Sequence, residues 1–412
     1  MTKKNLTIVA AILLIAIQAV LVRAAWGDWD PDFGNIIGGA PSIVADTDLY
    51  PASIAIQPDG KILVTGYRQP PGRARQMFLL RFLPNGGVDM DFGRNGFATF
   101  IRNPPFEIPR LHSSEGERLA LLPDGDITVS GRAGGDYAVW RFSEDGVAVM
   151  GFGSGGVSKL DYPASQATSD IAVQGEKLIV GVGKGQDLLV VIRLNERGRQ
   201  DRGFGNRGEV ETDIQGQTFS MFVETENGKI TIGGLDITEI PPCLRSGRLM
   251  PDGESDPSFF ADFSNPDGFF APRDLLRLSN QKYVFRTDTG SGMPFPPPTS
   301  FLTILDMFGG LETRFPFHTK EDSTPNYAPV ILAQQSDGKV IVSGHQTIYS
   351  LNSDLDPGSA QMCNCDPAFE LFSNKTSAVL QPDNKMVTAA RHKVTGNLSL
   401  IRTLPPSSRT DF

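Results

Sequence analysis

The chain has little cysteine. Its 412 residues include only three, Cys243, Cys363 and Cys365, which are too few for a disulfide framework. In an oxidising compartment Cys243 has two alternative disulfide partners, and one thiol stays free in either case. A redox or metal site at Cys363-x-Cys365 is disfavoured because no histidine lies nearby in the sequence to complete a ligand set.

Signatures of catalysis are also scarce. No Gly-x-Ser-x-Gly nucleophile elbow occurs, and Asp288-Thr289-Gly290 occurs once, whereas an aspartic protease needs two carboxylates that share a proton. The glycine-rich segment 181–185 lacks the Gly-Lys-Ser/Thr ending of a phosphate-binding loop, so we predict a strand end with a turn. We expect no catalytic residues and no histidine metal site, because the histidines stand in different parts of the chain without metal-ligand spacing: His112, His318, His345 and His392.

Basic residues are in the minority, with 38 Lys and Arg against 47 Asp and Glu and a net charge of −9. An acidic protein repels nucleic acids and anionic membrane surfaces, so we expect neither as a partner. The N-terminus resembles a secretory signal, with Lys3 and Lys4 before an apolar run from Leu6 to Val22 and a cleavage position after Ala24. We predict a signal peptide at 1–24, a secreted or periplasmic protein, and no membrane insertion after cleavage; a retained anchor is the alternative.

The sequence is rich in turn-forming residues, and it repeats itself. Its 44 glycines and 30 prolines indicate many short elements joined by turns. The string Gln57–Gly66, QPDGKILVTG, returns in good copies that begin at positions 122, 225 and 335. Weaker copies surround three lysines: Lys177, Lys282 and Lys385. Such self-similarity is typical of propellers, solenoids or arrays.

One repeat is predicted to form four short strands. Ile54 and Ile56 alternate with small residues before a Pro-Asp-Gly turn at 58–60, and Ile62 and Val64 resume the alternation after it. Period-two spacing on both sides of such a turn predicts a β-hairpin. A third strand at 78–82, a turn at 84–87 and a fourth strand near 97–101 complete a unit of the size of one propeller blade.

A recurring phenylalanine gives the number of blades. It follows an acidic or polar turn at spacings of 43 to 60 residues, and its eight positions enclose seven units: Phe33, Phe92, Phe152, Phe204, Phe259, Phe315, Phe369 and Phe412. We expect it to fill the gap between neighbouring sheets, because a single blade cannot bury its own face. The prediction is an all-β, seven-bladed propeller of four-stranded antiparallel repeats that forms one domain over 25–412.

An arginine recurs in the strand before the second turn, in five of the seven units: Arg81, Arg141, Arg193, Arg248 and Arg402. A ring of cations around a channel is one interpretation. We prefer another, in which each guanidinium pairs locally with an acidic group or carbonyl at the turns of its blade, because Asp and Glu stand nearby in the same unit.

The pattern of residues 57–66, followed by Arg-Phe-x-Pro-Asn-Gly-Gly-Val from Arg81 and Asp-x-Asp-Phe-Gly from Asp89, resembles the delta-60 repeat of bacterial surface and secreted proteins. The resemblance extends over 30–412 and is weaker in the units around Lys177 and Lys282. It implies a propeller-like repeat architecture without a shared catalytic motif.

Two irregular segments interrupt the period. Residues 293–299 contain four prolines, and residues 356–366 carry two of the cysteines. We expect surface loops there, and loops on a regular scaffold are where binding sites tend to lie. The acidic segment Asp28–Asp32 offers oxygen ligands for Ca²⁺; apart from this alternative we expect no cofactor.

Propeller faces gather loops from every blade around one axis. We therefore predict an extracytoplasmic, non-catalytic binding or surface-interaction module with a protein or carbohydrate ligand. The alternative is an extracytoplasmic hydrolase or lactonase, which needs carboxylates from several blades at the axis. A purely structural envelope component is a third interpretation.

Overall fold

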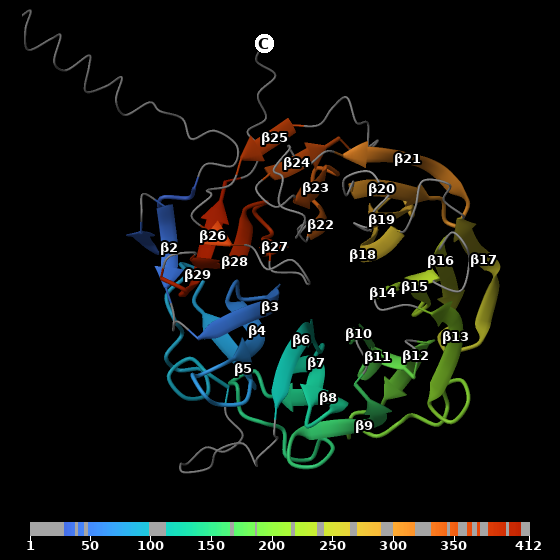
Figure 1. Cartoon of the computed structure of the whole chain (residues 1–412), viewed down its shortest axis with the longest axis horizontal. Coiled ribbons are helices and arrows are strands. Elements are labelled where there is room, and N and C mark those ends of the chain that lie inside the picture. The colour runs from blue at the N-terminus through green and yellow to red at the C-terminus, as the bar shows by residue number, and fades with distance from the viewer. Residues whose placement is uncertain are drawn as a thin grey trace, which may run out of the picture.

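The computed structural model is a ring of seven small antiparallel sheets around a central axis (Figure 1). It describes residues 29–37, 40–44, 48–98, 113–164, 169–185, 188–215, 219–236, 243–263, 270–289, 300–317, 331–343, 347–352, 361–364, 369–370, 378–392 and 395–404. Every regular element in these ranges is a strand. The predicted seven-bladed propeller is confirmed.

Blades 1 to 3 follow one another along the chain. Blade 1 contains β3 (Leu49–Ile56), β4 (Ile62–Arg68) and β5 (Gln76–Phe82). Blade 2 contains β6 (Ser114–Leu121), β7 (Ile127–Ala133), β8 (Asp136–Phe142) and β9 (Val157–Pro163). Blade 3 contains β10 (Asp170–Gln174), β11 (Lys177–Lys184), β12 (Leu188–Leu194) and β13 (Glu209–Gln215).

Blades 4 to 6 repeat the pattern. Blade 4 contains β14 (Phe219–Val223), β15 (Ile230–Asp236), β16 (Cys243–Leu249) and β17 (Ser255–Phe263). Blade 5 contains β18 (Phe270–Arg277), β19 (Tyr283–Thr289), β20 (Ser300–Leu305) and β21 (Leu311–Phe317). Blade 6 contains β22 (Ile331–Gln334), β23 (Val340–Ser343), β24 (Thr347–Leu351) and β25 (Gln361–Asn364). The weaker repeats around Lys177 and Lys282 thus form regular blades.

Blade 7 closes the ring with strands from both ends of the chain. It contains β26 (Phe369–Glu370), β27 (Ala378–Leu380), β28 (Met386–His392), β29 (Leu398–Thr403), β1 (Asn35–Ile37) and β2 (Ala40–Val44). β2 pairs antiparallel with β29, and β1 pairs with β2 at the outer edge. The first and the last strands of the described chain thus lie in one sheet.

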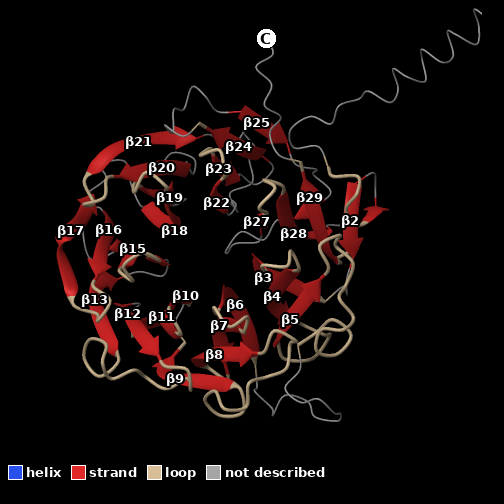
Figure 2. Cartoon of the chain, turned by 180° about the vertical axis from the view of Figure 1, so that it is seen from behind, coloured by secondary structure: helices blue, strands red, loops and turns tan. Residues whose placement is uncertain are grey.

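Loops and turns connect the strands all around the ring (Figure 2). Because neighbouring strands are antiparallel, these connections alternate between the two ends of the strands. The Pro-Asp-Gly turn joins β3 to β4, and the turn after β5 lies at the same end of the sheet because the strands are antiparallel. We call this side of the ring the turn face. The opposite side, which carries the β4–β5 connection and the entry to each inner strand, is the loop face.

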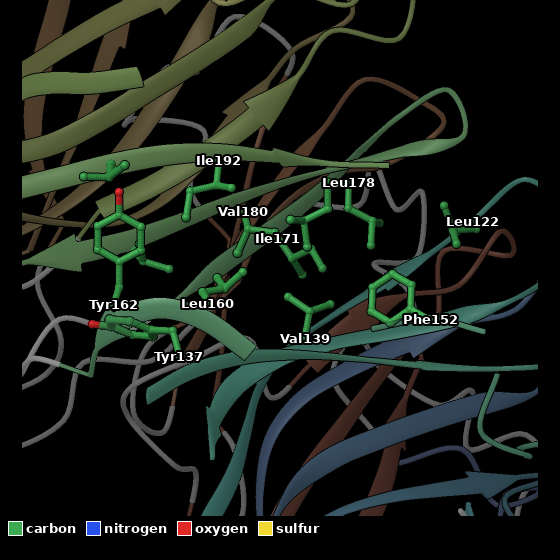
Figure 3. Packing of buried hydrophobic residues seen from close by; sticks show 13 residues of the cluster. Leu122, Tyr137, Val139, Phe152, Leu160, Tyr162, Ile171, Leu178, Val180 and Ile192 are labelled. Carbon is green, nitrogen blue, oxygen red and sulfur yellow. The ribbon is translucent and has the colours of Figure 1, made fainter. Parts of the chain in front are cut away.

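The recurring phenylalanine fills the space between blades, as predicted. Phe33, Phe92, Phe152, Phe204 and Phe259 are all at most 2% exposed. Phe152 lies among residues of blades 2 and 3, such as Val139 and Leu178 (Figure 3). The side chains of Phe315 and Phe369, and Phe412 as a whole, lie outside the described residues.

Each such ring also needs space on the neighbouring turn. A Cβ atom added to Gly146 would lie 2.7 Å from the Phe92 ring, and Gly146 has a φ of +78°. The glycine of the blade 2 turn therefore serves two purposes, since it adopts the left-handed conformation and admits the ring of blade 1.

The recurring arginine pairs with an acidic group of its own blade, which is the interpretation preferred from the sequence. Arg81 is buried and its Nε donates to Asp89 at 2.9 Å, while its guanidinium lies 4.3 Å from the Phe92 ring centroid. Lys61, from the Pro-Asp-Gly-Lys turn, lies 3.8 Å from the same carboxylate. Arginine, lysine, aspartate and phenylalanine of the repeat thus form one unit around a buried guanidinium, which we call the clamp.

The clamp also reaches the next blade, which the sequence did not predict. Arg81 Nη1 donates to the carbonyl of Glu144 at 2.6 Å, in the corresponding turn of blade 2. Four further bonds have the same geometry: Arg141 to Glu196 O, Arg193 to Pro251 O, Arg248 to Met307 O and Arg402 to Pro84 O. The arginines therefore tie neighbouring blades together and do not form a ring of channel cations.

The clamp lowers the pKa of its aspartates. A hydrogen bond from Lys177 holds the pKa of Asp201 below its ordinary value and outweighs the opposite effect of burial; the Gly203 amide and the charge of Arg193 contribute further. Burial would raise the pKa of Asp256, but hydrogen bonds from Lys229 and other donors lower it well below its usual range.

Blade 2 carries a rearranged clamp. Val149 stands where the other clamps have aspartate, and Asp126 stands where they have lysine. Arg141 bonds to Asp126 at 2.6 Å and to Asp124 at 2.7 Å. The carboxylate has moved from one turn to the other, and the guanidinium remains paired.

Candidate functional site

The loop-face ends of the inner strands form a polar layer around the axis. Strand register places one position of each inner strand at the same level, and it is polar in five of the six inner strands where it is described. These residues are Ser53, Arg118, Asp170, Ser220 and Asp274, with Ile331 as the sixth. Inner strands surround the centre of the ring (Figure 1), so this layer lies nearest the axis.

A β-bulge positions the acidic side chain of blade 2. The register of β6 against β7 shifts between Gly116 and Arg118, which leaves Glu117 as the extra residue. Gly131 lies opposite the bulge, and a Cβ atom there would lie 1.9 Å from the Glu115 carbonyl oxygen. The glycine of the repeat is therefore required by the close approach of the inner strand.

Glu117 is 5% exposed and bonds across the blade boundary. Its Oε2 accepts from the Ser169 amide at 2.5 Å and from the Ser169 hydroxyl at 2.7 Å. Its Oε1 accepts from Arg132 Nε at 3.1 Å. Both carboxylate oxygens are thus engaged, and they hold the start of blade 3 against blade 2.

Asp170 connects three blades. Its Oδ2 accepts from the Met221 amide of blade 4 at 2.9 Å, and its Oδ1 accepts from the Ile171 amide at 2.9 Å. Arg118 of blade 2 lies 3.6 Å from Oδ1. This carboxylate is neutralised and bonded on both oxygens, as Glu117 is.

These two carboxylates are therefore poorly placed for acid–base chemistry, which needs an oxygen within hydrogen-bond reach of a substrate. Within the described ranges, no group of three or more His, Cys, Asp or Glu side chains is placed to hold a metal ion. Asp30, from the segment considered for Ca²⁺, bonds to Lys385 and Arg402 as part of a clamp, and Asp28 lies outside the described residues.

A second cluster lies on the loop face where blades 7, 1 and 2 meet. The rings of Tyr50 and Tyr67 stack with centroids 4.7 Å apart and planes at 8°. Arg75 covers the outer face of Tyr67 at 4.4 Å, and Arg391 of blade 7 lies over Tyr50 at 4.5 Å. Arg75 Nη1 donates to Glu115 of blade 2 at 2.9 Å. We call these five residues the tyrosine–arginine array.

Sequence reasoning missed the array because its residues do not belong to the repeat. The one available signal was the connection 67–76, which holds three arginines and no acidic residue. Of the two segments that were expected to be surface loops with a site, 293–299 is outside the described residues, and within 356–366 the described residues Gln361–Asn364 form β25.

The remaining sequence features have structural places. Asp288 and Thr289 end β19, and residues 181–183 lie in β11, as expected of a strand end. Cys243 is on blade 4 and Cys363 on blade 6, with blade 5 between them, which separates them beyond the reach of a disulfide. Cys365 and three of the four histidines lie outside the described residues. Among described residues no helix is long and apolar enough to cross a membrane.

Comparisons with known proteins support the architecture. A family described as "Domain of unknown function (DUF5122) beta-propeller" matches residues 57–92. No curated protein sequence matches the chain.

Three solved structures are similar in fold. Polysaccharide lyase Uly1 has a TM-score of 0.53 at 12% identity, with 93% of this chain and 98% of that chain covered. A streptogramin B lyase has 0.51 at 12% identity, covering 88% and 98%. Sqt1 of Chaetomium thermophilum, bound to the N-terminus of the ribosomal protein L10, has 0.51 at 10% identity, covering 85% and 96%. At such identities the likeness concerns the fold alone, and propellers of this kind serve different functions.

Proposed function

We propose that this chain is an extracytoplasmic, non-catalytic binding propeller of the delta-60 kind, which presents its loop face to a ligand. The observation that carries the proposal is the state of Glu117 and Asp170. The carboxylates of these two inner-strand residues are engaged by amides, a hydroxyl and guanidinium groups, most of them from neighbouring blades. Residues occupied in this way stabilise a scaffold and leave ligand contact to the loops.

The extracytoplasmic part of the proposal depends on the N-terminal signal pattern and on the resemblance of the repeats to those of secreted and surface proteins. Mass spectrometry of the protein from its native cells tests it. We expect a mature N-terminus after Ala24, and an intact N-terminus in a cytoplasmic fraction would contradict the proposal.

The binding role is tested by blocking one face at a time. In a background with the three cysteines replaced by serine, Ala74→Cys places a thiol on the loop face and Arg199→Cys places one on the turn face, both at exposed positions. Each thiol is then coupled to a polyethylene glycol maleimide. We expect saturable binding to the envelope fraction of the native cells to be lost with the loop-face label and kept with the turn-face label.

The bound material is then recovered and its mass compared with untreated material. An unchanged mass agrees with a binding module. Shortened or chemically altered material, or loss of binding with the turn-face label only, would overturn the proposal. Product formation that disappears in Glu117→Gln would favour the hydrolase or lactonase alternative.

A further inference from the structure

The connection between β4 and β5 is a basic surface on an acidic protein. Residues 67–76 contain Arg68, Arg73 and Arg75 and no carboxylate, whereas the whole chain has a net charge of −9. A turn orders the connection, since the Arg73 amide donates to the Pro70 carbonyl at 3.1 Å. Arg68 pairs with Asp48 at 2.9 Å, so the positive charge that can attract an anion at the loop face of blade 1 comes from Arg73 and Arg75.

Stacking on Tyr67 fixes the orientation of the Arg75 guanidinium. Tyr67 lies between the ring of Tyr50 and the guanidinium of Arg75, so both of its faces are covered. The stack leaves ring edges, the hydroxyl and the edge of the guanidinium to meet a ligand. A planar guanidinium held against an aromatic ring presents its donors in a fixed fork, which matches a carboxylate or sulfate.

The open groups of the array are hydrogen-bond donors. Arg75 uses Nε toward Gln69 and Nη1 toward Glu115, and Nη2 has no partner among the described residues. Within the described ranges, neither the side chain of Arg73 nor the Tyr67 hydroxyl has a hydrogen-bond or ion-pair partner. Burial raises the pKa of Tyr67, so its hydroxyl stays a donor at neutral pH. A ligand that satisfies these groups must be rich in acceptors and negatively charged.

Hydrophobic anchors lie on the other side of the ring. The large apolar residues most exposed in the described structure are all at turn-face positions: Met90, Met150, Met307, Phe308 and Leu311. Among the described residues, the array offers a protein partner no exposed aliphatic anchor of the kind that the centre of a protein interface normally contains. A saccharide presents many hydroxyl acceptors and needs no such anchor, so the observations favour a glycan over an acidic peptide.

We infer that the tyrosine–arginine array, together with the adjacent Arg73, binds an acidic glycan, with Arg73 and Arg75 receiving its carboxylate or sulfate groups and the Tyr67 hydroxyl donating to a sugar oxygen. This inference rests on the proposed binding role and adds the ligand class. Arg391 and Glu115 position the two ends of the array from the neighbouring blades.

Biolayer interferometry with immobilised polysaccharides tests the inference. The probes are polygalacturonate and heparin as carboxylated and sulfated glycans, dextran as a neutral one, and poly-L-glutamate as an acidic peptide. Arg73→Gln combined with Arg75→Gln should weaken binding of an acidic glycan by about 30-fold or more, because two charge-assisted contacts are lost. Tyr67→Phe keeps the stack and should weaken binding by about 3- to 10-fold.

The matched control combines Arg199→Gln with Arg202→Gln, which removes the same charge from exposed turn-face positions. Its affinity should equal that of the unchanged protein. Arg73→Gln alone tests the surface without disturbing packing, because Arg73 is exposed.

Three results would overturn the inference. They are equal weakening by the control pair, equal binding of dextran or of poly-L-glutamate, and no binding of either acidic glycan. In the last case, loop-face binding to the native envelope would still support the proposed function, so the two failures are distinguishable.

Discussion

The rearranged clamp of blade 2 predicts how the free energy of unfolding changes when the charges at positions 61 and 89 of blade 1 are rearranged in the same way. In blade 1, Arg81 and Asp89 have side chains that are 5% and 7% exposed, and Nε lies 2.9 Å from the carboxylate. Asp89→Val leaves a buried guanidinium beside Lys61 without a carboxylate. Removing one partner of a buried pair costs about 3–5 kcal/mol in the free energy of unfolding.

The partner substitution, Lys61→Asp, places a second carboxylate beside Asp89. Because Lys61 is 29% exposed, solvent screens the repulsion, and we expect a loss of about 1–2 kcal/mol. The double variant reproduces the arrangement of blade 2, where Arg141 bonds to Asp126 at 2.6 Å. It should therefore lie within about 1.5 kcal/mol of the unchanged protein, which implies a coupling energy of at least about 2.5 kcal/mol between the two positions.

Urea denaturation followed by circular dichroism and by fluorescence measures these energies. The control applies the same types of substitution, Asp136→Val and Lys159→Asp, to a pair whose side chains are 40% and 46% exposed. Its coupling energy should stay below about 1 kcal/mol. If the losses of the blade 1 double variant equal the sum of the single losses within about 0.5 kcal/mol, the clamp does not work by charge pairing and the reasoning is refuted.

Three further predictions concern the scaffold. The clamp aspartates with lowered pKa values bind protons less readily when folded than when unfolded, so their contribution is complete above about pH 4 and is lost as the pH falls through the lowered pKa values. These are Asp30, Asp201 and Asp256, and an acid titration by circular dichroism should show unfolding that shifts in Asp201→Asn. Gly146→Ala should lower the free energy of unfolding by about 2–4 kcal/mol, because it combines strain at positive φ with overlap onto Phe92. Adding Phe92→Leu should recover part of this loss. Gly151→Ala is the control: it has no neighbour within 4 Å and should change the free energy of unfolding by less than about 0.5 kcal/mol. Deleting residues 1–44 exposes the edge of β29 and should cause self-association on size-exclusion chromatography; a peptide of residues 29–44 should reverse it, and a monomer with unchanged urea midpoint would contradict the closure mechanism.

The repeated parts of the fold were predictable because each residue of the repeat has the same structural role in every blade. The burial of Phe92 and its equivalents and the local pairing of Arg81 follow from the repeat itself. The bond from Arg81 to the next blade was not predictable, because it depends on how two sheets are placed side by side. The rearrangement at Val149 and Asp126 was missed for a related reason, since each change alone looks like the loss of the motif.

The array was beyond sequence reasoning for a different physical cause. Tyr50 and Arg391 are brought together only when the last blade closes against the first. A ligand surface needs individual residues at individual places, so it appears as departures from the repeat. The same departures that blur a periodic signal are those that distinguish one propeller from another.

Closure by β2 has a consequence for biosynthesis. β2 is made early, yet its partner β29 is almost the last strand to be synthesised. Until then, blades 1 to 6 can form only an open arc. The amides and carbonyls of β2 that bond to β29 stay without a partner during this time. The ring therefore closes last. A chain that ends before β29 keeps unpaired strand edges at both ends of the arc, and these edges can pair with another incomplete copy.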